Sequence, residues 1–347
     1  MFKHPLTNPL GSDTRSDSGV SDLAVLRNPI SIKNLTFTNR YVCAPLDMQN
    51  ATETGLVTEE MLALYRERKG PALIIAEHHR ILQSGKWNVK QLAADRDECI
   101  DGLTRLAQTI HENQQIAVAQ INHVGSAADT HVTWMEAVAP SAVVHPVLNR
   151  SVPRELSLSE IQDIKQAFVK AAMRVKQAGF DGVEIHGAHG YLLTQFLSPL
   201  TNQRQDEYGG SLEKRSRFLM EVVEAVRQAV GSDYLLLYRL GADDYLPGGT
   251  TVDDACWLAP KLAAAGVDIL DISSGLKGSR AFSGPGFFRD MLKRVKNSVT
   301  IPTIGVGGLE EPAVAAEVLT HSEADFIALG RAIMKEPNYV EKVLAGI

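Results

Sequence analysis

Two histidines and a tyrosine follow a short apolar run near the middle of the chain. The run at 182–187 reads "GVEIHG", and His186, His189 and Tyr191 lie at its end or just beyond it. Two imidazoles can ligate a metal ion or donate hydrogen bonds to one oxygen atom, and a phenol can supply a proton. The same residues could also simply pack or bind structural water. The rest of the chain must separate these interpretations.

Other polar side chains stand at the ends of comparable apolar runs. Gln120 and Arg239 each come near the end of a run, and strand alternation turns Glu184 and His186 toward the same side. Burying such groups is unfavourable unless they are paired or bind a ligand. We therefore expect Arg239 to face a ligand, with a structural ion pair to Glu184 as the alternative.

Glycines end the last two apolar runs. Gly307 and Gly308 follow one of them, and Gly330 precedes Arg331 after the other. Glycine lets backbone N–H groups approach an oxyanion, and a guanidinium can bind a phosphate through two hydrogen bonds. Glycine after a strand is also ordinary turn chemistry. The pattern nevertheless favours a phosphate site.

A metal centre is the less favoured interpretation of the histidines. His78, His79, His123, His186 and His189 all lie at or near the ends of apolar runs. A catalytic zinc ion needs three well-placed ligands, and no HxH or HExxH motif occurs in the chain to supply a local pair. A metal site would also leave the phosphate-type glycines unexplained. We therefore expect no metal.

Eight strand–helix units account for the positions of these residues. Short apolar runs alternate with helix-length amphipathic segments, as a parallel sheet buried on both faces requires. The runs are 40–46, 72–78, 116–122, 182–187, 234–240, 267–273, 301–307 and 325–330. The sequence therefore predicts an α/β fold, a (β/α)8 TIM barrel whose active site lies at the carboxyl ends of the strands.

The N-terminal region differs from the rest. Residues 1–28 are largely polar, and we expect them to form a tail that precedes a catalytic domain at 29–347. The stretch "PISIKNLTFTNR" alternates apolar and polar residues and predicts a β-hairpin.

Composition narrows the class of function. The net charge of -6 argues against nucleic acid or an anionic membrane as the partner, and favours a small-molecule substrate. The 3 cysteines are scattered, and no signal-like or membrane-spanning apolar run is present. We therefore expect a cytoplasmic enzyme.

A long motif gives a specific resemblance. The stretch Gly182–Phe218, "GVEIHGAHGYLLTQFLSPLTNQRQDEYGGSLEKRSRF", resembles the old yellow enzyme family of FMN-dependent oxidoreductases. So do "NRYVCAPL", "GVDILDISSG" and "ADFIALGRAIMKEP", and the resemblance extends over nearly everything after residue 28. It implies a barrel, bound FMN, and NADPH or NADH as the reductant, in the compact bacterial branch of the family.

The resemblance also implies roles for individual residues. His186 and His189 should bind the substrate carbonyl oxygen, and Tyr191 should donate a proton to the substrate carbon. The expected flavin contacts are Ala44, Pro45, Leu46, Asp47, His78, Gln120 and Arg239, with Gly307, Gly308, Gly330 and Arg331 at the phosphate. The implied activity is reduction of activated C=C bonds, and the alternatives are a flavin-dependent dehydrogenase or demethylase and a catalytically quiet FMN-binding protein.

Departures from the family pattern limit how far these roles carry over. Asp47 stands where a Thr or Cys is usual near the flavin, Gln49 replaces an aromatic substrate-binding residue, and Ser126 replaces an Arg. Asp47 could act as an ionised carboxylate, act as a protonated donor, or turn away toward a cation. The chain ends at "KVLAGI", before the arm that reaches a neighbouring subunit in the branch, so a homo-oligomer is left open.

Overall fold

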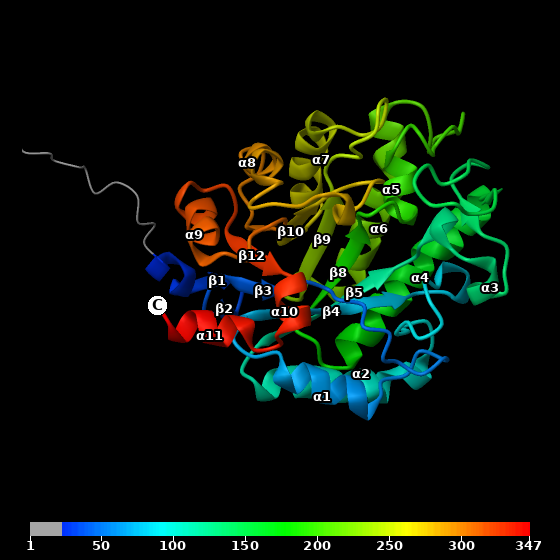
Figure 1. Cartoon of the computed structure of the whole chain (residues 1–347). Coiled ribbons are helices and arrows are strands. Elements are labelled where there is room, and N and C mark those ends of the chain that lie inside the picture. Colours follow the sequence, from blue (N-terminus) through cyan, green and yellow to red (C-terminus); the bar gives the residue numbers. More distant parts are fainter. Residues whose placement is uncertain (1–22) are drawn as a thin grey trace, which may run out of the picture.

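The computed structural model describes residues 23–347, which form a closed barrel of parallel strands surrounded by helices (Figure 1). The strands are β3 (Tyr41–Cys43), β4 (Leu73–Arg80), β5 (Ile116–Asn122), β8 (Gly182–Gly187), β9 (Leu235–Gly241), β10 (Ile269–Ser273), β11 (Thr303–Gly305) and β12 (Phe326–Leu329). Their order around the barrel is β10-β11-β12-β3-β4-β5-β8-β9. Each strand coincides with one of the predicted apolar runs, so the predicted TIM barrel is confirmed.

Every residue of these barrel strands is buried, because side chains on one face fill the barrel and those on the other contact the helices. The register of the strands places polar residues side by side inside the barrel. Gln120 lies opposite Glu184 between β5 and β8, and Arg239 lies opposite both His186 on β8 and Asp271 on β10. The polar side chains predicted at strand ends therefore form a continuous group.

Amphipathic helices cover the barrel. The longer ones are α1 (Glu59–Glu67), α2 (Ile100–Glu112), α4 (Leu158–Gln177), α6 (Leu212–Val230), α7 (Val252–Ala264), α8 (Arg289–Lys296), α9 (Pro312–Thr320) and α11 (Tyr339–Ala345). Short helices α3 (Thr130–Thr133), α5 (Leu192–Leu197) and α10 (Arg331–Lys335) follow strands or loops. Among the described residues, no helix is both long enough and apolar enough to cross a lipid bilayer.

The predicted N-terminal hairpin is present. β1 (Ile30–Ile32) pairs antiparallel with β2 (Leu35–Phe37), and Lys33 in the turn has a φ of 53°. Before it, a 3₁₀ helix (Leu23–Arg27) buries Leu26, and Arg27 donates a hydrogen bond to the Leu344 carbonyl in α11. Residues 1–22 of the predicted tail lie outside the described residues, and the boundary at 28 stays a prediction.

The family-like string beyond Tyr191 builds scaffold around the site. Arg204 donates hydrogen bonds to the carbonyls of Pro140 (2.9 Å) and Leu156 (2.6 Å), next to strands β6 (Val138–Ala139) and β7 (Arg154–Glu155). Asn202 donates to two further carbonyls in the same string, at 2.6 and 2.7 Å. These buried polar side chains satisfy loop carbonyls that would otherwise lack partners.

Candidate active site

A cavity of about 640 Å³ lies at the carboxyl ends of the barrel strands, within the size range of small-molecule and cofactor sites. The predicted site residues that line it are Ala44, Pro45, Leu46, Asp47, His78, Gln120, His186, His189, Tyr191, Arg239, Gly307, Gly308, Gly330 and Arg331. Gln49 does not line it: its side chain is exposed, and its backbone N–H donates to Asp47 Oδ1 at 3.2 Å. A substrate contact by Gln49 therefore stays a prediction without support from this cavity.

The rings of the predicted catalytic residues form one cluster in this cavity. The His186 ring centroid lies 5.1 Å from that of His189 and 5.0 Å from that of Tyr191, both edge to face. The Tyr191 ring stacks on His78 at 5.8 Å. A small oxygen-bearing group could therefore contact both imidazoles while a neighbouring atom faces the phenol.

The backbone after β8 is shaped to present the histidines. His189 has a φ of 60°, a conformation that is rare for a residue with a side chain. Its N–H donates to the Ser274 carbonyl at 3.1 Å, which holds the turn. Gly190 follows with a φ of 73°, and a Cβ there would lie 2.6 Å from His145 Nε2. Unusual backbone conformations of this kind cluster at functional sites.

Both histidines are neutral near pH 7. Burial, and then the charges of neighbouring His and Arg side chains, hold the pKa of His186 and of His189 well below the ordinary value. His186 Nδ1 accepts a hydrogen bond from the Ala188 N–H at 3.2 Å, so its proton is on Nε2. His189 Nε2 lies 2.8 Å from the Ser273 hydroxyl. If that hydroxyl donates, His189 carries its proton on Nδ1.

Tyr191 is a protonated phenol under the same conditions. Burial, and then the negative charge of Asp47, raise its pKa above the ordinary value. The phenol can therefore donate a proton, but it releases one only to a strong base.

Asp47 is an ionised carboxylate rather than a protonated donor. Burial opposes its charge, but a hydrogen bond and charge from His78 outweigh burial and leave its pKa below the usual range. Asp47 Oδ2 accepts from Asn88 Nδ2 at 2.5 Å and lies 3.6 Å from His78 Nε2. Behind it, burial and the Asp47 charge raise the pKa of Glu77 to about 8, so Glu77 holds a proton.

Gln120 and Arg239 are each held by a buried carboxyl group. Gln120 Nε2 donates to Glu184 Oε2 at 2.6 Å, and Arg239 Nε lies 3.2 Å from Asp271 Oδ2. Arg239 thus forms its ion pair with Asp271, and the alternative pairing with Glu184 is wrong. Both Gln120 and Arg239 still line the cavity.

The glycine-rich end of the cavity is suited to an anion. Gly307 and Gly308 have φ values of 107° and 71°. A Cβ on Gly307 would lie 2.7 Å from the Phe288 ring, and one on Gly308 would lie 2.0 Å from the Gly284 carbonyl oxygen. Arg331 has no ion-pair partner within residues 23–347, and its guanidinium lies 5.9 Å from the Phe287 ring centroid. An FMN phosphate fits this combination of free backbone and unpaired cation.

The sequence did not single out several loop residues that complete the cavity. Trp87 contacts Tyr191 with ring centroids 5.5 Å apart, and His145 Nε2 lies 3.0 Å from the Gly190 carbonyl. Val147, Leu148 and Leu276 add apolar surface to the lining. These residues follow no strand or helix period, so no pattern in the sequence marked them.

The remaining histidines have structural partners. His79 Nδ1 lies 3.0 Å from the Gln120 carbonyl oxygen, and His123 Nε2 lies 3.1 Å from the Ser84 hydroxyl. In the part of the chain that the structure describes, no group of three or more His, Cys, Asp or Glu side chains is placed to hold a metal ion.

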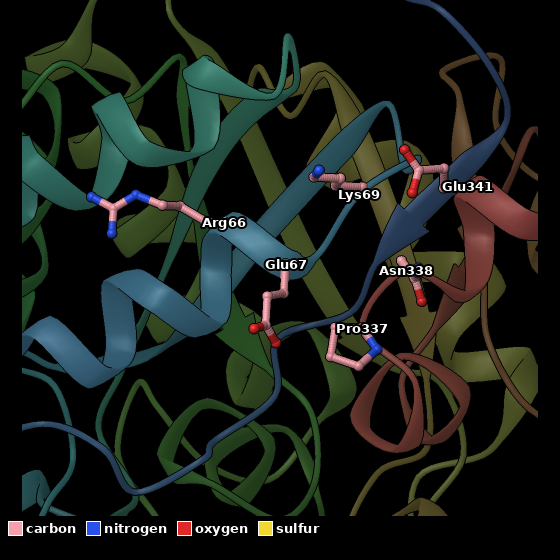
Figure 2. A pocket seen from close by; sticks show the side chains of 6 residues that line it. All are labelled: Arg66, Glu67, Lys69, Pro337, Asn338 and Glu341. Carbon is pink, nitrogen blue, oxygen red and sulfur yellow. The ribbon is translucent and has the colours of Figure 1, made fainter.

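A second pocket, of about 430 Å³, shares no lining residue with this cavity (Figure 2). It is between the end of α1 and the start of α11, and it is lined by Arg66, Glu67, Lys69, Pro337, Asn338 and Glu341. Its cations and carboxylates are equal in number, and Figure 2 shows Arg66 directed away from the others. None of the predicted site residues is here.

The fold is a closed barrel with a cavity at the carboxyl ends of its strands, and the glycine-rich end of that cavity suits a phosphate group. Residues 25–347 match the family described as "NADH:flavin oxidoreductase / NADH oxidase family". The chain belongs to this family. The resemblance to the old yellow enzymes, a family of FMN-dependent oxidoreductases, is thereby confirmed.

Similar sequences carry names from the same class. The chain is 38% identical to an NADH oxidase of Thermoanaerobacter brockii, over 91% of this chain and 50% of the relative. It is 39% identical to an NADPH dehydrogenase of Bacillus cytotoxicus, over 90% of both chains. A metal reductase of Desulforamulus reducens is 36% identical, over 93% of this chain and 49% of the relative. The chain thus spans about half the length of two of these relatives.

Solved structures agree with this grouping. A 2-naphthoyl-CoA reductase in complex with 2-naphthoyl-CoA superposes with a TM-score of 0.90 at 29% identity, over 93% of this chain and 52% of that one. An old yellow enzyme homologue from Zymomonas mobilis superposes with a TM-score of 0.83 at 28% identity, over 92% of both chains.

Proposed function

We propose that this protein is an ene-reductase that uses NADPH or NADH to reduce the C=C bond of α,β-unsaturated carbonyl compounds. The observation that carries the proposal is the cluster of two neutral imidazoles and one phenol in the cavity, with ring centroids 5.0 to 5.1 Å apart around His186. This set of groups matches the needs of conjugate reduction: donors for a carbonyl oxygen and an acid for a carbon.

The residues present fit FMN as the cofactor. Gln120 and Arg239 would contact the pyrimidine part of the ring system, and the backbone at 44–47 with His78 would contact its edge. Gly307, Gly308, Gly330 and Arg331 would hold the phosphate. When bound, FMN supplies the hydride that the protein itself cannot provide.

Side chains of the protein would carry out the remaining steps of the reaction. His186 and His189 hold the substrate carbonyl oxygen and stabilise the negative charge that develops on it. Tyr191 protonates the substrate carbon next to the carbonyl group. Trp87 and Leu148 line the cavity beside Tyr191 and limit the access of water.

Three further points are part of the proposal. The Bacillus cytotoxicus relative is named for NADPH and the Thermoanaerobacter brockii relative for NADH, so either nicotinamide suits the reductive step. A cytoplasmic location rests on three cysteines that are all free, which is typical of reducing compartments. The substrate is a small molecule, and assembly into a homo-oligomer is compatible with this function.

The decisive experiment mixes the oxidised holoprotein anaerobically with NADPH or NADH, and then with 2-cyclohexenone, while flavin absorbance is followed. Bleaching by the nicotinamide and recovery with the enone support the proposal. Bleaching without recovery favours a dehydrogenase or demethylase, and no bleaching favours a quiet FMN-binding protein. A protein that takes up no FMN would contradict all of these functions.

A further inference from the structure

Two buried carboxyl groups, Glu184 and Asp271, lie behind the cavity wall. Neither has any exposed surface, and neither lines the cavity. Each contacts one residue that does line it: Glu184 lies opposite Gln120 between β5 and β8, and Asp271 lies opposite Arg239 between β9 and β10. The four side chains therefore form a row inside the barrel, with two members facing the cavity.

Glu184 determines which end of the Gln120 amide faces the cavity. Gln120 Nε2 donates to Glu184 Oε2 at 2.6 Å, so the amide nitrogen points into the barrel. The carbonyl oxygen is then the end available to a ligand. That oxygen is an acceptor, which suits the ring N–H of a flavin pyrimidine. Without Glu184, nothing in this row would prevent the amide from rotating.

Asp271 anchors Arg239 and balances its charge. Arg239 Nε lies 3.2 Å from Asp271 Oδ2, with both side chains deeply buried. Two ionised carboxylates beside one guanidinium would leave an uncompensated negative charge in the interior, which is strongly unfavourable. One carboxyl group must therefore hold a proton.

The proton is on Glu184. Burial, and then the charge of Asp271, raise the pKa of Glu184 well above its ordinary value. Asp271 is the charged partner of Arg239. The charged groups that act on Glu184 are Asp271 from β10 and Arg239 from β9, and those that act on Asp271 are Arg239 and Glu184.

We propose that Glu184 and Asp271 are positioning residues: Glu184 orients Gln120, and Asp271 sets the effective charge of Arg239, so that together they control the affinity and reduction potential of bound FMN. This inference rests on the proposed function, because it takes Gln120 and Arg239 to contact the flavin. It goes beyond that function in assigning control of the flavin to residues that line no cavity.

The test compares three variants by titrating apoprotein into FMN and by measuring the reduction potential of the holoprotein. Glu184→Leu leaves the Gln120 amide without its buried partner and should weaken FMN binding about tenfold. Glu184→Gln keeps a neutral group of the same shape whose oxygen accepts from Gln120, so its Kd for FMN should stay within about threefold of the natural protein. Asp271→Asn should shift the potential to a more positive value, because Arg239 loses its counter-charge.

Asp268→Asn is the matched control. Asp268 directly precedes the first residue of β10 and pairs with Arg227 at 2.7 Å. The Asp268→Asn variant therefore removes the same charge away from the cavity, and it should leave the reduction potential of bound FMN unchanged. Equal FMN affinities in Glu184→Leu and the natural protein would overturn the role of Glu184, as would equally weak binding in both Glu184 variants. Equal potentials in Asp271→Asn and Asp268→Asn would overturn the role of Asp271.

Three outcomes separate a failure to fold, a failure of the proposed function and a failure of this inference alone. If Glu184→Leu does not fold, Glu184→Gln and Asp271→Asn decide the proposal, since both preserve the shape of the side chain. If the natural protein itself binds no FMN, the proposed function fails together with this inference. If the natural protein binds FMN and the variants behave like it, only this inference fails.

Discussion

Ser273 should control which nitrogen of His189 carries the proton. The Ser273 hydroxyl lies 2.8 Å from His189 Nε2, and Ser273 is fully buried at the end of β10. When the hydroxyl donates, His189 has its N–H on Nδ1, free for a ligand oxygen. Ser273→Ala removes this donor, so His189 can also place its proton on Nε2, where it does not serve the ligand.

The expected loss is smaller than that for removing the imidazole. A hydrogen bond of this kind contributes a net 0.5–1.5 kcal/mol, roughly a factor of 2 to 12 in an equilibrium constant. Loss of a whole oxyanion donor costs about 3 kcal/mol, or roughly a hundredfold or more. Ser273→Ala should therefore weaken binding of a phenolate ligand about fivefold, and His189→Ala should weaken it far more.

Titration with p-hydroxybenzaldehyde, followed by the long-wavelength flavin absorbance, measures this directly. Ser274→Ala is a close control, because Ser274 is equally buried and its hydroxyl has no hydrogen-bond partner among the described residues. The Ser274 variant should bind the phenolate normally. If Ser273→Ala binds it as well as the natural protein does, Ser273 does not set the tautomer of His189.

Four other predictions follow from the same geometry. Tyr191→Phe should leave reduction of FMN by NAD(P)H nearly intact but slow its reoxidation by an enone roughly a hundredfold. Stopped-flow measurement of both half-reactions checks this, and unchanged reoxidation would show that another acid protonates the substrate. Asp47→Thr should raise the flavin reduction potential at pH 7, because an ionised carboxylate beside the flavin opposes the negative charge added on reduction. Identical reduction potentials in the variant and the natural protein would mean that Asp47 does not influence the flavin. Arg331→Ala should weaken FMN binding roughly tenfold or more through loss of a charge-assisted hydrogen bond, whereas the exposed Arg294→Ala should not. Glu77→Gln should flatten the pH dependence of stability. Because the pKa of Glu77 is raised, the stability that Glu77 contributes is complete below about pH 4.5 and is lost as the pH rises through about 8. Thermal melts from pH 5 to 9 that show the same slope of melting temperature against pH in both proteins would refute the protonated state.

The barrel was predictable because its strands are buried on both faces. Each apolar run, such as 116–122, is long enough to be a strand and too uniformly apolar to be a surface helix. Polar residues within these runs then mark the cavity, and Gln120, His186 and Arg239 all line it. Asp271 carries the same signal, an acid inside an apolar run, and it could have been identified as the partner of Arg239 by its position on the neighbouring strand.

The loop residues were not predictable in this way. Trp87 and His145 reach the cavity from segments with no regular period, and their positions depend on hydrogen bonds such as that between His145 and the Gly190 carbonyl. Gln49 was expected to contact substrate, yet the left-handed backbone at this position, with a φ of 55°, leaves its side chain exposed. Side-chain direction in a loop is set by backbone conformation, which the sequence motif alone did not reveal.

The protonation states of the cluster restrict how the chemistry can be divided. His186 and His189 are neutral, so each has a single N–H, and using it to hold an oxygen leaves no proton to give away. In the proposed reaction the phenol of Tyr191 is then the acid of the cluster, and its raised pKa makes it a weak one that releases its proton only to a strong base. Negative charge that enters the cavity meets Arg239, whose charge is itself shared with Asp271, and also Arg280 and Arg331 of the lining. A site built this way offers neutral donors for polarisation, a weak acid for protonation and fixed cations in its lining, which is the arrangement that the proposed conjugate reduction requires.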